Sequence, residues 1–367
     1  MTRAREIETL EQLDDVLSMT HRLDGLRIQG VDLTAREEAL LGCDPRGAVV
    51  LGGILTDRLD EHLRHGGALV FPAFTDAPVD PYRSRLYDAR ELYAGLAEGG
   101  YAGTPDARAY AWSQDSEIAG DVYATLLRAI HDDSIGDALD ELCAGRRVVG
   151  VMGGHALRRG EPAYRDAARL GRSLARLGVL VATGGGPGAM EAANLGARTA
   201  GLADQVLDDG IDRLAEVPWY ADDVTAWALL GLAVRDTLDA LTADVAATAR
   251  SVGVPTWFYG HEPPNVFGGG VAKLFSNALR EDGLLARCTH GVVYLPGEAG
   301  TVQEVFQAVT GHYYAAAPAA PLVLVGRGYW TDVVPVWPLL SALAAGRPMA
   351  ATIHLVDTVD DAAALYA

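Results

Sequence analysis

The residues best suited to chemistry in this sequence lie in one short stretch, residues 292–307. A β-branched and aromatic run ends there at Pro296-Gly297, and helical spacing of apolar residues begins at Gly300, so the stretch predicts a strand, a turn and a helix. The backbone N–H groups of the turn and of the first helical residues would point outward and could bind a phosphate. Beside that phosphate, Thr301 could contact the anion, and Glu304 could do acid–base work or stabilise a cationic sugar carbon.

Thr301 and Glu304 also have a purely structural interpretation. The spacing Thr-x-x-Glu is that of a capping box, in which the hydroxyl and the carboxylate satisfy backbone N–H groups at the start of a helix. The sequence by itself leaves both interpretations open.

The segment before this strand predicts a helix over residues 270–285, because its apolar residues share one face. The opposite face would carry two cations and two hydrogen-bonding groups, which could balance an anion or simply be solvated: Lys273, Ser276, Asn277 and Arg280. Lys273 is the only lysine among 30 basic residues. Either a coding bias toward arginine or a need for a compact ammonium at a phosphate would explain it.

Two further glycine turns follow predicted strands, Gly153-Gly154 after residues 148–152 and Gly184–Gly188 after residues 179–183. Neither turn fits the dinucleotide fingerprint convincingly, and Gly153-Gly154 does not end like a Walker A loop. NAD binding and ATP hydrolysis are therefore disfavoured, whereas a smaller phosphate-bearing ligand is compatible with these turns.

The order of the predicted elements indicates an α/β fold with a Rossmann-like, doubly wound parallel sheet over residues 146–367. Its strands are expected at residues 148–152, 179–183, 256–259, 292–295, 322–325 and 352–356. Residues 204–250 interrupt the alternation and predict a helical insertion of two or three helices, either a cap or a dimer face. Residues 1–145 lack a continuous alternation and are expected to form an N-terminal accessory domain.

Composition narrows the classes of partner. The net charge of −19 and pI near 4.8 oppose general binding to nucleic acid or to an anionic membrane. Three dispersed cysteines favour neither a disulfide framework nor a zinc site, and no other metal or cofactor is expected. The charged start of the chain and the lack of a long apolar run predict a cytoplasmic protein.

The glycine motifs that begin at Gly184 and at Pro296 resemble the paired signatures of the Lonely Guy (LOG) family, once called lysine decarboxylase-like. They read G-G-G-P-G-A-M-E from Gly184 and P-G-E-A-G-T-V-Q-E from Pro296, against the family pattern PGGxGTxxE. The resemblance covers residues 147–356 and implies a Rossmann-like, usually dimeric protein. Glu298 departs from the pattern, since it places an anion where the family has a glycine and where backbone should approach phosphate.

The resemblance implies a nucleoside 5′-monophosphate phosphoribohydrolase, which releases a free base and ribose 5-phosphate, and a homodimer or higher homo-oligomer. Glu304 and Arg280 would be catalytic. The expected substrate- and phosphate-binding residues are Gly184, Gly185, Gly186, Gly188, Gly297, Gly300, Thr301, Lys273 and Asn277. The alternative is a non-catalytic carrier or sensor on the same scaffold, binding a nucleotide or a molybdenum cofactor; a purely structural partner is a third possibility.

Overall fold

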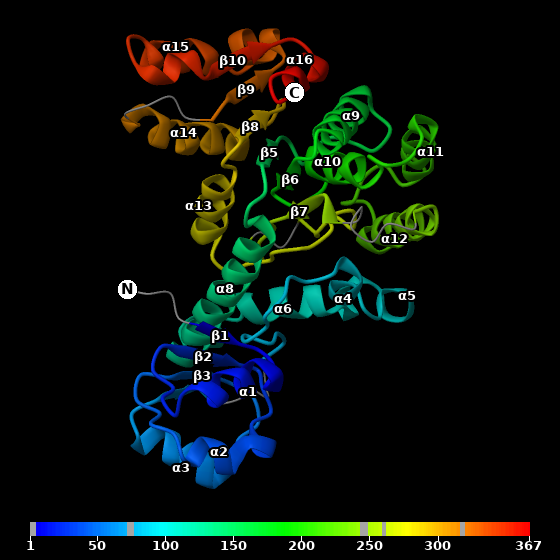
Figure 1. Ribbon diagram of the computed structural model, residues 1–367. Coiled ribbons are helices and arrows are strands. Elements are labelled where there is room, and N and C mark those ends of the chain that lie inside the picture. The colour runs from blue at the N-terminus through cyan, green and yellow to red at the C-terminus, as the bar shows by residue number, and fades with distance from the viewer. Residues whose placement is uncertain (1–4, 72–76, 243–248, 259–261, 316–319) are drawn as a thin grey trace. The chain divides into compact units, whose positions relative to one another are not determined.

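The computed structural model describes residues 5–71, 77–242, 249–258, 262–315 and 320–367 (Figure 1). The chain forms two compact units. The first consists of Met1–Arg85 and Asp121–Ala138, and the second of Leu86–Gly120 and Leu139–Ala367. Residues 86–120 therefore group with the second unit, although the sequence analysis places them in the accessory domain.

The first unit is built on a four-stranded parallel sheet in the sequential order β1-β2-β3-β4. Short helices connect successive strands, and the core consists of Ile, Leu and Val side chains between these helices and the sheet. The strands are β1 (Arg5–Ile7), β2 (Leu26–Gln29), β3 (Val49–Leu51) and β4 (Leu69–Phe71), and the helices are α1 (Leu10–Met19), α2 (Glu37–Leu41) and α3 (Asp57–His65).

The expectation that residues 1–145 lack a continuous strand–helix alternation is wrong for residues 5–71, where strands and helices alternate. Arg27 pairs with Val49 and Val49 with Leu69, so one strand–helix coil recurs about every 20 residues. Backbone hydrogen bonds from Gly25 N to Gly47 O (3.2 Å) and from Gly47 N to Gly67 O (3.3 Å) continue the ladder into the turns before the strands. Strands of three or four residues carry too few side chains to show a clear period in the sequence.

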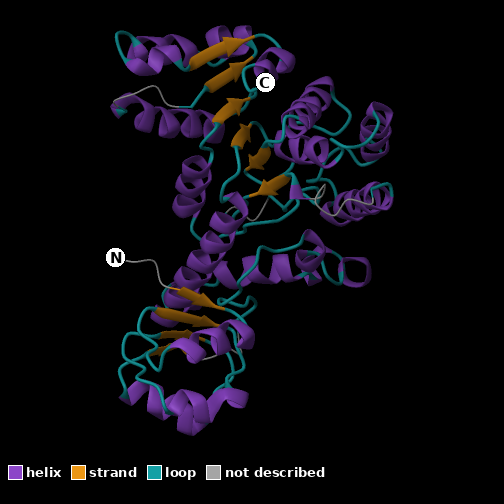
Figure 2. Cartoon of the chain, viewed as in Figure 1, coloured by secondary structure: helices purple, strands orange, loops and turns teal. Residues whose placement is uncertain are grey.

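The second unit contains a six-stranded parallel sheet in the order β10-β9-β8-β5-β6-β7 (Figures 1 and 2). This order confirms the Rossmann-like fold, because the chain starts in the middle of the sheet and winds outward in both directions. The strands are β5 (Val148–Met152), β6 (Leu180–Thr183), β7 (Ser251–Gly253), β8 (Gly291–Tyr294), β9 (Leu322–Val325) and β10 (Ile353–Val356).

Helices cover both faces of this sheet. In Figure 1, α9 and α10 lie on one side of it, and α13 and α14 lie on the other. The helices that follow β5 are α9 (Pro162–Arg176), α10 (Ala189–Arg198), α11 (Asp204–Leu214), α12 (Val224–Ala240), α13 (Asn277–Arg287), α14 (Ala299–Tyr314), α15 (Val336–Ala344) and α16 (Val359–Ala364). Those before it are α4 (Ala89–Leu92), α5 (Leu96–Gly99), α6 (Pro105–Gln114), α7 (Ser116–Ala119) and α8 (Val122–Cys143), of which α8 runs from one unit into the other.

Helices α9 and α10 pack unusually closely. A Cβ at Gly196 would stand 1.8 Å from the Ala168 carbonyl oxygen, and one at Gly171 would stand 2.1 Å from the Ala193 oxygen. Only glycine allows such an approach of two backbones. All ten residues of α10 are buried, so the turn that precedes it is anchored to the core.

Two predicted elements differ from the structure. The third strand of the sheet is β7, whereas the predicted strand at 256–259 is reduced to a bridge between Thr256 and Leu274, with residue 259 outside the described part. The helix predicted from residue 270 begins only at Asn277, where the Ser276 hydroxyl caps it by accepting the Leu279 N–H (3.3 Å). Residues 271–274 instead run extended beside β7. Three of their backbone N–H groups donate hydrogen bonds to carbonyls of other segments rather than to carbonyls within a helix.

The inserted region contains α11 and α12, as predicted; residues 243–248 lie outside the described part. Among the helices described, none is both long enough and apolar enough to cross a membrane.

Candidate functional site

A cavity of about 310 Å³ opens where the direction of winding reverses, between β5 and β8. Its walls come from the loops after β5, β6, β7 and β8 and from the first turns of α13 and α14. Parallel strands all end at the same edge of their sheet, so the turns after β5, β6 and β8 converge although they are far apart in sequence. A volume of this size is at the small end of the range of ligand sites, about 300–1,000 Å³.

Arg280 lies in the first turns of α13 and is held in a defined orientation. Its Nε donates to the Val254 carbonyl at 2.9 Å, and its Nη1 lies 3.7 Å from Glu304 Oε1. Its Nη2 reaches over Gly184, where a Cβ would come within 2.3 Å of that nitrogen. A side chain at residue 184 would therefore displace the guanidinium from its present position.

Glu304 lines the same cavity from the second turn of α14, with only 12% of its side chain exposed. Burial raises the pKa of its carboxyl to about 7, because the charged form loses hydration. Arg280 acts in the opposite direction, while the neighbouring Glu281 and Glu262 carboxylates add to the increase. An acid with a pKa near neutrality can both give and take a proton at physiological pH.

The capping-box interpretation of Thr301 and Glu304 is wrong. Helix α14 begins at Ala299, its N-cap is Glu298, and that residue makes no side-chain capping bond. Thr301 is thus already inside the first turn, and Glu304 is directed to Arg280 and the cavity rather than to the backbone. The first N–H groups of α14 have no partner within the helix, and the residues that carry them, Ala299, Gly300 and Thr301, line the cavity.

Asn265 holds the glycine turn before α10 in place through two hydrogen bonds. The Asn265 N–H donates to the Gly185 carbonyl (2.8 Å) and its Nδ2 donates to the Gly186 carbonyl (3.1 Å). Gly185 N–H in turn donates to the Thr183 hydroxyl (3.1 Å). Because C=O and N–H point in opposite directions across a trans peptide, the Gly186 N–H points away from Asn265.

Lys273 does not reach the cavity. It is 2% exposed, and its Nζ lies 2.6 Å from Asp106 Oδ1. Asp106 also accepts hydrogen bonds from Trp257 Nε1 (2.9 Å) and Tyr101 Oη (2.8 Å). Burial lowers the pKa of Lys273, while Asp106 opposes that shift. The only lysine of the chain therefore serves a buried ion pair, because residues 271–274 are not helical.

The structure brings together six of the predicted site residues and separates the other five. Those that line the cavity are Gly184, Gly186, Gly300, Thr301, Arg280 and Glu304. Those that do not line it are Gly185, Gly188, Gly297, Lys273 and Asn277. Gly185 and Gly188 have positive φ and shape the turn, and Asn277 donates from Nδ2 to the Glu281 carboxylate at 2.8 Å.

Among the polar and charged residues that line the cavity, the sequence did not predict His155, Thr256, Glu262, Glu281 and Gln303 as site residues. His155 Nδ1 lies 3.3 Å from Glu262 Oε1, so the loop after β5 meets the loop after β7. No motif marks Glu262 or His155, whereas Glu281 is adjacent to Arg280 and could have been suspected. Glu298 also lines the cavity, and its exposed carboxylate forms no ion pair with any described residue.

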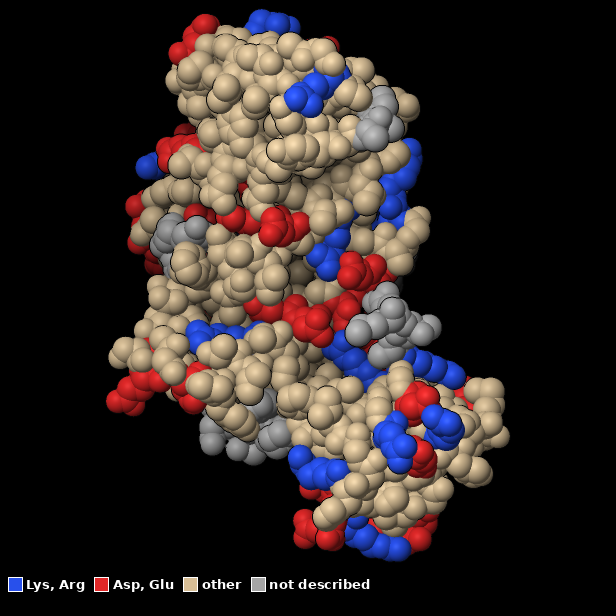
Figure 3. Space-filling model, turned by 90° about the vertical axis from the view of Figure 1, so that its left-hand side faces the viewer, with Lys and Arg blue, Asp and Glu red and all other residues tan. Residues whose placement is uncertain are grey.

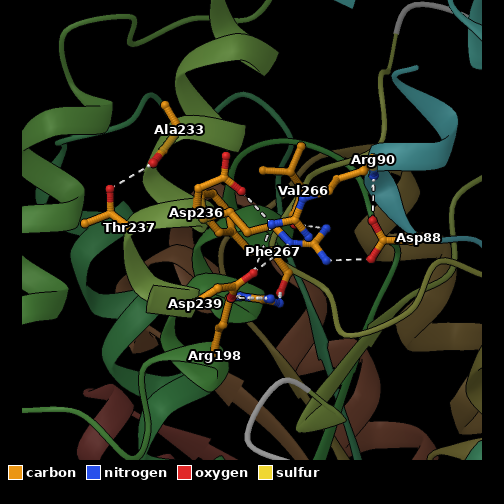
Figure 4. A network of polar contacts seen from close by, with 10 residues as sticks. Asp88, Arg90, Arg198, Ala233, Asp236, Thr237, Asp239, Val266 and Phe267 are labelled. Atoms are coloured by element: carbon orange, nitrogen blue, oxygen red, sulfur yellow. Dashed lines mark hydrogen bonds and ion pairs between the residues drawn. The ribbon is translucent and has the colours of Figure 1, made fainter. Parts of the chain in front are cut away.

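A network of arginines and aspartates supports the loop that carries Glu262 and Asn265 (Figure 4). Arg198 donates to the Phe267 carbonyl (3.3 Å) and to Asp239 (2.5 Å). Arg235 donates to the Val266 carbonyl (3.1 Å) and to Asp88 (2.5 Å). Two carbonyls of the loop are thus bound to α10 and α12, which keeps the cavity wall in place.

Acidic and basic groups are interspersed on the face shown in Figure 3, and no broad basic surface is visible among the described residues of that face. Within the described residues, no three His, Cys, Asp or Glu side chains lie close enough together to hold a metal ion.

The fold and the site define a Rossmann-like α/β protein with a ligand cavity at the switch point of its sheet. Residues 146–248 match the model of the SLOG cluster4 family, and residues 241–366 match that of a family described as possible lysine decarboxylase. The two matches together cover residues 146–366 and confirm the resemblance of that region to the LOG-like, lysine decarboxylase-like family. None of the curated proteins matches the sequence.

Solved structures similar to this chain include two proteins associated with the molybdenum cofactor. The molybdenum cofactor binding protein from Rippkaea orientalis is 16% identical, with a TM-score of 0.38, over 60% of this chain and 96% of that chain. The Moco carrier protein from Chlamydomonas reinhardtii is 20% identical, with a TM-score of 0.34, over 60% of this chain and 94% of that chain.

Proposed function

We propose that this protein hydrolyses the N-glycosidic bond of a nucleoside 5′-monophosphate to give a free base and ribose 5-phosphate. The observation that carries the proposal is the buried Glu304, whose pKa is raised to about 7, paired with Arg280 in a cavity of nucleotide-monophosphate scale. The match of residues 241–366 to the lysine decarboxylase-like family model supports the same reaction class.

The walls of the cavity suggest how the substrate lies. The free N–H groups at the start of α14, near Gly300 and Thr301, would bind the phosphate. Glu304 is one helical turn further along, which would bring the ribose rather than the phosphate to its carboxyl. Arg280 would orient the substrate from the opposite side, and Gly186 would contribute a further N–H group.

Glu298 restricts this mode of binding. Its carboxylate stands at the N-cap of α14, where it repels an approaching phosphate dianion. In this proposal the phosphate contacts the N–H groups of Gly300 and Thr301, and the Glu298 side chain turns toward solvent. Glu298→Gly would then lower KM, because the repulsion disappears while the N–H groups remain.

The experiment is to incubate the purified protein with a panel of purine and pyrimidine nucleoside monophosphates and to measure free base by chromatography. Hydrolysis of at least one nucleotide is expected, and Glu304→Gln should reduce kcat about 100-fold or more, because an acid–base group typically contributes this much. Equal release by the wild type and Glu304→Gln, or no release from any nucleotide, would remove the enzyme proposal.

The alternative is a protein that binds a nucleotide or a molybdenum cofactor without turnover. Such a protein needs the glycine turns but has no need of an acid–base carboxyl facing the ligand. It would be favoured if a ligand raised the melting temperature of the protein and was recovered intact.

A further inference from the structure

The cavity contains a second buried carboxylate, Glu281, which no motif marks. It is 8% exposed and lies on α13 immediately after Arg280. Its Oε1 lies 3.8 Å from Arg280 Nη1, the same nitrogen that lies 3.7 Å from Glu304 Oε1. One guanidinium nitrogen is therefore shared by two carboxylates from two different helices.

The surroundings of the two carboxylates differ. Glu281 Oε1 accepts a hydrogen bond from Asn277 Nδ2 at 2.8 Å, and its Oε2 accepts one from Gln303 Nε2 at 2.6 Å. Both oxygens of Glu281 are thus occupied by amide donors. No hydrogen bond to a Glu304 carboxylate oxygen is found among the described residues, where Arg280 is its one ion-pair partner.

We infer that the two carboxylates divide the work of the proposed reaction: Glu281, held by its two amide donors, stabilises the cationic sugar, while Glu304 is the group that moves the proton. This inference rests on the proposed hydrolysis. Two carboxyl groups held in different environments commonly take such different parts in glycoside chemistry.

In this reaction Glu304 is the only protein group that gives and takes a proton. As the bond between C1′ and the base nitrogen breaks, its electron pair goes to that nitrogen, which takes the proton of Glu304. Water then adds through its oxygen to the cationic C1′ and returns a proton to Glu304. Glu281 neither gains nor loses a proton, and its negative charge lowers the energy of the positive charge that develops on the sugar.

Several charged and titratable groups face Glu304, and Glu281 is one of them. Arg280 and Glu281 approach from α13, Glu262 from the loop after β7, Tyr294 from β8 and Cys288 from the end of α13. The neighbouring Glu281 carboxylate contributes to the raised pKa of Glu304, since one anion disfavours a second anion nearby.

The first test needs no substrate. The titration of the Glu304 carboxyl is followed by carbon-13 NMR of glutamate-labelled protein and assigned by comparison with Glu304→Gln. In Glu281→Gln the pKa of Glu304 should fall toward its ordinary value, because a neighbouring negative charge has been removed. Asp282→Asn is the matched control, since it removes a carboxylate from the next position of α13, which bonds Gln307 and does not line the cavity.

The second test uses turnover of the best nucleotide. Glu281→Gln should lower kcat about 100-fold with KM changed much less, as expected when a charge acts mainly on the transition state. The alkaline limb of its pH profile should move to lower pH. Gln303→Ala, at an exposed position, removes the donor to Glu281 Oε2 and should give a smaller loss of kcat in the same direction.

The outcomes separate the two proposals. Hydrolysis that is unchanged in Glu281→Gln, with an unchanged Glu304 titration, would overturn the division of roles and leave the hydrolase standing. If Glu281→Gln lowers the pKa of Glu304 but the wild type hydrolyses no nucleotide, the hydrolase proposal is overturned. The effect of the Glu281 charge on Glu304 is then still supported.

Discussion

Glu304 links the proposed chemistry to the stability of the protein, because it is buried without a full set of partners. The pKa of its carboxyl in the folded protein, about 7, lies above the ordinary value of 4.5. The folded protein therefore binds this proton more tightly than the unfolded chain does, and the stabilisation is lost as the pH rises through about 7.

We predict that Glu304→Gln makes the protein more stable at pH 8 but changes its stability little at pH 4. A neutral amide avoids the cost of burying a charge, and a shift of this size corresponds to about 3 kcal/mol at high pH. Urea unfolding of the wild type and the variant at several pH values measures the difference. A difference in unfolding free energy that stays constant from pH 4 to pH 8 would contradict the raised pKa.

Helices α9 and α10 determine where the glycine turn before α10 can lie. The turn leads directly into α10, and α10 is held against α9 through the close approach at Gly196 and Gly171. The position of Gly184 and Gly186 in the cavity therefore depends on glycines that never touch a ligand.

Gly196→Ala should destabilise the protein by about 1–3 kcal/mol, because its methyl group would overlap the Ala168 carbonyl oxygen of α9. Gly311→Ala in α14 is the matched control: nothing lies within 4 Å of its added methyl group, and alanine should stabilise the helix by about 0.5–1 kcal/mol. Thermal unfolding compares the two variants. Equal shifts in Tm for both would show that the close helix contact is absent.

At the scale of the whole molecule, the second unit is discontinuous in sequence. Residues 86–120 supply Asp106 and Asp88, which pair with the buried Lys273 and Arg235. A chain cut at the boundary that composition suggests, near residue 145, would leave both cations buried without these partners.

A protein of residues 146–367 should therefore be much less stable than one of residues 86–367, or fail to fold, since an unpaired buried charge costs about 3–5 kcal/mol. Circular dichroism melting of the two proteins makes the comparison. Lys273→Met in the shorter protein should recover part of the lost stability. Equal Tm values for the two lengths would show that residues 86–120 are dispensable for this unit.

Local patterns in the sequence determined a large part of this protein. Runs such as Leu322–Val325 and Val148–Met152 are apolar and bounded by turns, so the strands that they form could be predicted to the residue. The strand, turn and helix around Gly300 followed from the same reasoning, whereas the catalytic pairing of Glu304 with Arg280 was implied by the family resemblance.

Tertiary contacts decided the rest. Residues 271–274 have helical spacing, yet they lie extended because β7 and Tyr87 offer their backbone groups partners. Lys273 consequently points to Asp106, more than 160 residues away in sequence, instead of to a phosphate. Glu281 became a site residue only because α13 and α14 place Asn277, Gln303 and Arg280 around it. The conformation of such a segment depends on its contacts with residues that are distant in sequence. The spacing of residues within the segment carries no information about those contacts.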